Sequence, residues 1–290
     1  MNGLGVAIKS EIFLGLRSFG CKFIVLAPSL IVILQYLIVK LTESSQSAGN
    51  ALAGFDSRGN ASFDDIIASN AYGYFVDGLS TGLTMLGLML VAQAAYSFSY
   101  ERDIGTIRHL LIRRVSRSSL ILAKLLQLHL LALISLLLLL IVAYFSSGFL
   151  WEFGPIVEDG FELIGEAEIR EEIALGLRLA IIPLPAAIAF GLLVSVCAQS
   201  ATQAVTSALG ITLAIDIFKS LLGDKAYYLY ASFQPSLLDQ SYLQDVSRLV
   251  RGYSDVLVDE RFMQLNTWVP IPALLLFLIA TLWLVQRRKM

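Results

Sequence analysis

The stretch YERDIGTIRHLLIRRVSR, residues 100–117, lies between two long apolar runs and decides the fold of the chain. Its arginines and its histidine are too polar to lie in lipid, so the stretch belongs outside the membrane. Its apolar residues Ile104, Ile107 and Leu111 recur at helical spacing. The segment therefore predicts a basic amphipathic helix on the cytoplasmic face of a membrane, a feature typical of a docking site for a soluble partner.

The composition indicates that most of this chain lies within a membrane. Of the 290 residues, 57% are hydrophobic and only 15% are charged, and the mean hydropathy is +0.73. Soluble domains carry about 25% charged residues. A membrane crossing needs about 20 apolar residues. We therefore predict an all-α polytopic protein, with a single domain over residues 1–290 and six transmembrane helices at 23–39, 78–98, 121–145, 179–198, 204–222 and 269–285.

The basic residues predict the orientation of these spans, because short positively charged flanks stay in the cytoplasm. An even number of crossings returns both termini to one side. With both termini inside, twelve of the 21 basic residues lie in the cytoplasm, opposed there only by Glu11, Glu101 and Asp103. The opposite orientation would invert this bias. We therefore expect a multi-pass protein of the plasma (inner) membrane with both termini cytoplasmic.

Three segments outside the spans have their own patterns. Residues 1–22 mix apolar and charged positions at a helical period and predict an interfacial helix. Residues 42–70 are rich in Ser, Asn and Gly, which favours a linker. Residues 223–268 predict an outer loop that contains short helices.

Several function classes are excluded or disfavoured by what the sequence lacks. It contains no G-x-x-x-x-G-K-[ST] phosphate loop, so this chain does not hydrolyse ATP by itself. His109 and His129 have no nearby ligand partners, which disfavours a metal site. Cys21 and Cys197 fall in or beside apolar runs and do not form a disulfide framework. We expect no catalytic residue, no cofactor in this chain and no nucleic-acid partner.

Polar residues within the spans are candidates for a translocation path, since charge at membrane depth costs about 2.5–3.5 kcal/mol unless it is paired or hydrated. Asp216 and Lys219 are three residues apart and either pair with each other or contact substrate. Gln93 and Gln203 either line a cavity or bridge helices. His129 is either part of the path or a polar residue at a helix interface.

Two prolines, Pro183 and Pro185, predict a kink in the fourth span that frees backbone carbonyls. Such a kink suits a moving helix but is equally common in static bundles.

The basic segment has a physical reading of its own. Asp103 or Thr106 can cap a helix that runs to about Arg114, and Gly105 permits close backbone approach. Arg113 and Arg114 complement the negative end of that helix. The segment would form a rigid projection between the second and third spans.

The longer stretch YERDIGTIRHLLIRRVSRSSLILAKLL resembles the membrane subunits of ABC-type exporters of the type 2 class. The residues that carry the resemblance are Glu101, Gly105, Thr106, Leu110, Leu111, Ser116, Arg117 and Lys124. The segment AIKSEIFLGLRS is similar to the amphipathic start of that family, with Glu11 at its acidic position. The family often has a proline shortly before the Ser-Arg pair, whereas this chain has Arg114-Val115.

The resemblance implies a permease that is not itself an enzyme. It would lie in membrane lipid, pair with a second copy or a paralogue, and bind two ATPase subunits that carry ATP and magnesium. The two central faces would form the route by which a substrate moves outward. The residues implied in ATPase coupling are Glu101, Asp103, Gly105, Thr106, Leu110, Leu111, Arg113, Arg114 and Arg117 of the coupling helix 100–117, together with Glu11.

Two other function classes remain open. A secondary transporter or channel would need carboxylates near the membrane midplane, and only Asp216 approaches this description. A membrane enzyme or scaffold would need a catalytic constellation that the sequence does not offer.

Overall fold

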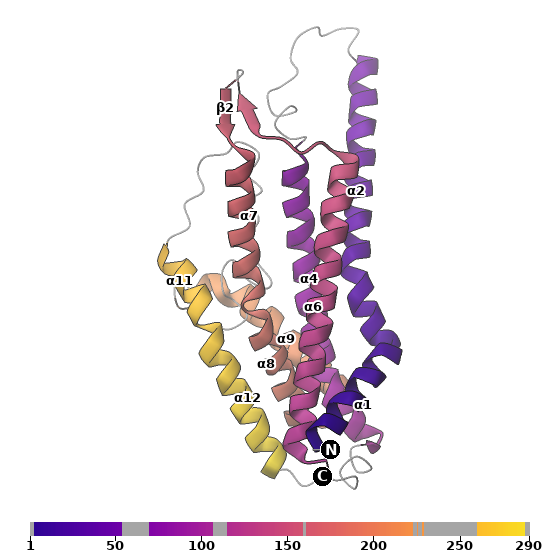
Figure 1. The fold of residues 1–290 in the computed structure, drawn as a ribbon, viewed down its shortest axis with the longest axis vertical. Coiled ribbons are helices and arrows are strands. Elements are labelled where there is room, and N and C mark those ends of the chain that lie inside the picture. The colour runs from indigo at the N-terminus through magenta and orange to yellow at the C-terminus, as the bar shows by residue number, and fades with distance from the viewer. Residues whose placement is uncertain are drawn as a thin grey trace.

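The computed structural model describes residues 3–53, 70–106, 115–158, 161–222, 225, 228 and 260–287. Long helices make up nearly all of this part and run along one axis (Figure 1). They are α1 (Gly3–Arg17), α2 (Phe19–Ala53), α4 (Ala71–Asp103), α6 (Arg117–Leu150), α7 (Glu166–Ile181), α8 (Leu184–Cys197), α9 (Ala201–Leu222), α11 (Glu260–Trp268) and α12 (Pro270–Arg287). The prediction of an all-α protein is confirmed.

In the part of the chain that the structure describes, five helical stretches are long and apolar enough to cross a membrane. They are Phe19–Ser45, Ala71–Asp103, Arg117–Leu150, Glu166–Cys197 and Gln264–Arg287. Each overlaps one of the predicted spans over all or nearly all of its length. The remaining predicted span, 204–222, lies in α9, whose apolar part Ala201–Ile215 is shorter. The count of six spans therefore stays a prediction.

The bundle has two distinct ends. Helix α1 and the C-terminal end of α12 lie at one of them (Figure 1), which we call the terminal end. Here Ala7 of α1 and Val285 of α12 belong to one buried cluster with Phe98 of α4 and Ile121 of α6. Both α1 and α12 pack against α6, so the first and the last described helix meet the same helix at this end of the bundle.

Helix α4 lies at the centre of the bundle and packs against α2, α6, α8 and α9. Small residues let α8 approach α4 closely. A Cβ placed on Gly191 of α8 would lie 2.7 Å from the Cβ of Ala94 and 2.8 Å from the carbonyl oxygen of Val91. Close contact through small residues is how helices associate in lipid, where burial of apolar surface gives little advantage.

At the opposite end of the bundle, the residues that follow α6 contact the start of α4. Asn70 caps α4 by accepting a hydrogen bond from the Tyr72 N–H, and its Nδ2 donates to the Gly154 carbonyl at 2.9 Å. The chain then forms an antiparallel hairpin of β1 (Ile156–Glu158) and β2 (Phe161–Ile164). The sequence analysis predicted no strands, and these two short ones are an addition to the all-α description.

The fourth span is broken at Pro183, as its prolines predicted. Pro183 has no N–H, so the Leu179 carbonyl one turn earlier loses its helical partner. Asn266 of α11 takes that place, because its Nδ2 donates to the Leu179 carbonyl at 2.8 Å. Asn266 is fully buried. The freed carbonyl thus fixes α11 to α7.

The linker predicted at 42–70 begins later than its composition indicated, since α2 continues as a helix to Ala53. In the predicted outer loop 223–268, the helix α11 is described, and most of the remainder lies outside the described residues. The helical form of α1 is confirmed, while its position at a membrane surface stays a prediction.

Candidate functional site

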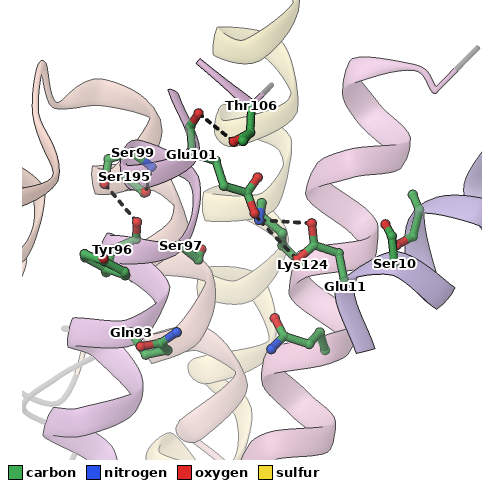
Figure 2. Close-up of polar contacts among 12 residues, drawn as sticks. Ser10, Glu11, Gln93, Tyr96, Ser97, Ser99, Glu101, Thr106, Lys124 and Ser195 are labelled. Carbon is green, nitrogen blue, oxygen red and sulfur yellow. Dashed lines mark hydrogen bonds and ion pairs between the residues drawn. The ribbon is translucent and has the colours of Figure 1, made fainter. Parts of the chain in front are cut away.

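Three buried charged residues meet where α1, α4 and α6 converge at the terminal end (Figure 2). Lys124 Nζ on α6 lies 3.1 Å from Glu11 Oε1 on α1 and donates a hydrogen bond to Glu11 Oε2 at 3.2 Å. The same ammonium lies 2.5 Å from Glu101 Oε1 on α4. We call Glu11, Glu101 and Lys124 the charged triad. A single cation thus joins three helices.

The residues around the triad explain how the helices bring it together. Helix α1 buries Ala7 and Glu11, which are one turn apart and therefore share a face. Helix α6 buries Leu120, Lys124 and Leu128 at the same interval. These two faces pack against each other, so Glu11 and Lys124 meet inside an otherwise apolar contact.

The electrostatics of the triad are unbalanced, because two carboxylates face one ammonium. The side chains of Lys124 and Glu11 are 1% and 5% exposed, and that of Glu101 is 16% exposed. Burial raises the pKa of Glu11 above its ordinary value, the attraction of Lys124 lowers it in part, and the negative charge of Glu101 raises it further. Removing the cation would leave buried carboxylates unpaired, which costs about 3–5 kcal/mol.

Helix α4 ends at Asp103, two residues after Glu101, and Gly105 follows the C-cap residue Ile104. Gly105 has φ of 77°, a left-handed conformation that favours glycine after a helix C-terminus, and its N–H donates to the Arg102 carbonyl at 3.0 Å. A Cβ at this position would meet no atom within 4 Å. The backbone conformation therefore requires glycine here, and the close approach that we predicted from the sequence is not observed in the described part.

Two residues that flank segment 107–114 in the sequence, Asp103 and Arg117, contact other helices. The Asp103 carboxylate accepts a hydrogen bond from the Ala201 N–H at 2.7 Å, where the positive N-terminus of α9 favours an anion. The Arg117 guanidinium donates to the carbonyls of Val285 and Gln286 at 3.3 and 3.5 Å, at the negative C-terminus of α12. Two predicted coupling residues thus tie α4 to α9 and α6 to α12.

The other predicted coupling residues divide into two groups. Thr106 is exposed, and its Oγ1 donates to the Glu101 carbonyl at 3.0 Å. Leu110, Leu111, Arg113 and Arg114 lie outside the described residues. The cap that Asp103 or Thr106 would give to a helix ending near Arg114 is therefore untested.

A cavity of about 690 Å³ lies beside the triad, between α1, the start of α2 and the ends of α4 and α6. Glu11, Glu101 and Lys124 form part of its wall. Gln93, Tyr96 and Ser97 continue the wall along α4, and the side chains of Gln93 and Tyr96 are visible there in Figure 2. Charged and polar groups thus lie on the otherwise largely apolar wall of a cavity next to the connection between the spans.

Among the path candidates whose side chains are described, Gln93, His129 and Gln203, only Gln93 lines this cavity. Its Nε2 donates a long contact of 3.9 Å to the sulfur of Cys21, and Gln127 of α6 makes a similar contact of 3.6 Å. These amides bridge α2 to α4 and α6. Bridging helices was one of the two alternatives that the sequence left open for Gln93.

The structure places the remaining path candidates elsewhere. His129 Nδ1 lies 2.7 Å from the Leu125 carbonyl of its own helix. Gln203 is exposed, and its Oε1 accepts a hydrogen bond from the Gln199 N–H at 2.9 Å in the turn before α9. Asp216 and Lys219 lie on α9, and the positions of their side chains are not described. The described candidates do not converge on one path.

Sequence reasoning missed the charged triad, although each member was noted separately. The signal was Lys124, a cation one turn inside an apolar run, where an unpaired charge is costly. Glu11 and Glu101 are two of the three acidic residues predicted on the same side of the membrane. Pairing them with Lys124 requires knowing that α1 folds back onto α6, which the local sequence does not reveal.

The comparisons with known proteins identify a family. A family model described as ABC-2 family transporter protein matches residues 4–288. No match was found among curated proteins or among solved structures. The family match spans α1, the triad, the coupling segment and α12.

Proposed function

The chain belongs to the ABC-2 family of transporter proteins and is a multi-pass permease component of an ABC transporter, and on that premise we propose that it is an exporter subunit driven by two separate ATPase subunits. ATP and magnesium would be bound by those subunits. A second copy of this chain or a paralogue would complete the membrane part, with both termini in the cytoplasm of a plasma-membrane permease.

The charged triad is the observation that supports this proposal most strongly. Glu101 lies within one or two turns of the coupling segment, and its carboxylate is bound to the same ammonium as Glu11 of α1. A displacement of the segment would therefore act on α1, α4 and α6 together. A rigid connection of this kind is what force transmission from an external subunit needs.

The anchors at either side of the segment support the same function. Asp103 connects the segment to α9, and Arg117 connects it to α12. The flanking residues of segment 107–114 thus belong to α4 and α6 and contact α9 and α12. An ATPase that binds Arg113 and Arg114 could move all four of these helices together. Export, rather than import, follows from the family resemblance alone and belongs to the proposal.

The test is to purify the tagged chain from its native membrane and measure whether an ATP-hydrolysing subunit remains bound in equal copy number. We expect Arg113→Glu to release that subunit, because the charge reversal falls in the docking segment. Arg287→Glu is the matched control, since Arg287 is at the same end of the bundle but lies over the Trp283 ring, 4.1 Å from its centroid.

The outcome also separates the alternative class. Substrate transport that continues in vesicles without any ATPase subunit, driven by an ion gradient, would identify a secondary transporter or channel and reject the proposal. Loss of the ATPase from both variants equally would show that the contact lies elsewhere on this end of the protein.

A further inference from the structure

Two hollows adjoin at the bend between α1 and α2. The first is the cavity of about 690 Å³ described above, whose wall includes the charged triad. The second is a groove of about 420 Å³ between α1, α2 and α6. Gly15, Cys21 and Gln127 line both, so the two hollows are adjacent and share these residues as a common wall. A compartment that presents charged groups beside an apolar groove matches the two parts of an amphiphile.

The groove provides an apolar wall for an alkyl chain. Its lining includes Ile12, Leu16, Val25, Leu130 and Ile134. Burial of an alkyl chain against such side chains is favourable in proportion to the area covered. Because α2 and α6 are membrane-crossing helices, this groove opens within reach of the bilayer.

The cavity is complementary to a cation that carries N–H donors. Glu101 Oε2 is buried and has no hydrogen-bond partner within the described part of the chain. The triad contributes one negative charge in excess. Tyr96 and Tyr100 stack with ring centroids 4.6 Å apart and are 37% and 41% exposed. Exposed aromatic faces attract ammonium groups, so a primary amine in the cavity would lie beside the Glu101 side chain and the rings.

Two basic residues flank the hollows at the bend. Arg17 lines the cavity and Lys22 lines the groove, and both side chains are exposed. Neither forms an ion pair with any described residue. Arginine and lysine bind phosphate through charge-assisted hydrogen bonds. A phosphate between the amine and the alkyl chain would lie near them.

We propose that the two hollows bind one amine-headed phospholipid, of the phosphatidylethanolamine type, from the leaflet nearest the terminal end. Its ammonium contacts Glu101 and the Tyr96–Tyr100 pair, its phosphate lies against Arg17 and Lys22, and one acyl chain occupies the groove. The other chain stays in the bilayer. The lipid then bridges α1 to α4, beside the triad. This inference requires only that the chain spans the membrane and is independent of the ATPase partnership.

The experiment is native mass spectrometry of the full chain released from mixed bilayers of phosphatidylethanolamine and phosphatidylglycerol with the same acyl chains. We expect the wild-type chain to retain one ethanolamine lipid in about tenfold preference, the factor typical of a charge-assisted hydrogen bond. Glu101→Gln should remove the preference. Equal retention of both lipids, a preference for phosphatidylglycerol, or an unchanged preference in Glu101→Gln would overturn the proposal.

A second pair of variants tests the groove and does not depend on the triad. Leu130→Trp fills the groove and should reduce retention of the lipid. Leu133→Trp is the matched control, because Leu133 is on the same helix, is 54% exposed and lies outside the groove lining. If both tryptophan variants retain the lipid like the wild type, the bound molecule is an ordinary boundary lipid and the site is rejected, even where Glu101→Gln does not fold.

Discussion

The ammonium of Lys124 lies 3.1 Å from the carboxylate of Glu11, although 113 residues separate them in the chain. This ion pair is almost fully buried and holds the N-terminal helix α1 against α6. Helix α1 has few other polar contacts with the bundle, and Phe13, Leu14 and Leu16 on it are exposed. The position of α1 therefore depends on the charged triad more than on a large apolar interface.

Replacing Lys124 with methionine should destabilise the protein by about 3–5 kcal/mol, because Glu11 and Glu101 would remain buried without their cation. The measurement is the midpoint of thermal unfolding in detergent. The triple variant Lys124→Met, Glu11→Gln, Glu101→Gln should recover much of the loss, since it removes the uncompensated charge. Leu122→Ala, an exposed residue on the same helix, is the control. A Lys124→Met protein as stable as this control would contradict the buried triad.

The stability should also depend on pH through Glu11. Burial raises the pKa of Glu11 in the folded protein above its ordinary value of 4.5, so the folded state binds this proton more tightly than the unfolded chain. The contribution of Glu11 to stability is therefore fully present below that ordinary value and is lost as the pH rises through the folded pKa.

The test compares the wild type with Glu11→Gln over a series of pH values that rises from the ordinary carboxyl value of 4.5, because the Glu11 pKa is raised above it. The free energy of unfolding of the wild type minus that of the variant should increase as the pH falls. Glu171→Gln, at an exposed position on α7, serves as the control. A difference that increases toward alkaline pH would mean that the Glu11 pKa is lowered instead.

The local sequence predicted the helices well and their long-range contacts poorly. The five stretches that qualify as spans are apolar over 18 residues or more, a signal that needs no tertiary information. Pro183 likewise marked the break in the fourth span. In contrast, α2 continues through a Ser- and Asn-rich stretch to Ala53, where composition favoured a linker.

The candidate site was predicted only in part, because its local motif is visible in the sequence and its long-range contacts are not. Asp103, Gly105 and Arg117 were recognised as important from a contiguous motif. Their partners, such as Ala201 for Asp103, come from segments about a hundred residues away. The sequence predicted that Asp103 would cap a nearby helix, and the structure has it on the N-terminus of α9. The helix N-terminus that Asp103 binds is determined by the packing of α4 against α9.

The contact between Asn266 and Leu179 makes a prediction that couples two helices. Asn266→Leu should destabilise the protein by about 1–3 kcal/mol, because the Leu179 carbonyl would be buried without a donor. Pro183→Ala restores a backbone N–H one turn after Leu179, which can satisfy that carbonyl within the helix. Asn266→Leu should therefore cost clearly less in the Pro183→Ala background. A double-mutant cycle on thermal unfolding measures this difference, and strictly additive effects would show that the two residues do not share the carbonyl.

Gly105 provides the sharpest test of the link between α4 and the coupling segment. Gly105→Ala should cost about 1–2 kcal/mol, because a left-handed conformation is unfavourable for a residue with a Cβ. Gly154→Ala is the matched control, since a Cβ at either glycine meets no atom within 4 Å and only Gly105 has a positive φ. If the turn at Gly105 sets the direction of the coupling segment, Gly105→Ala should also weaken binding of the ATPase subunit in the purified complex. Gly154→Ala should change neither quantity. A Gly105→Ala protein that loses stability but binds the ATPase as tightly as the wild type would show that the segment docks independently of the end of α4.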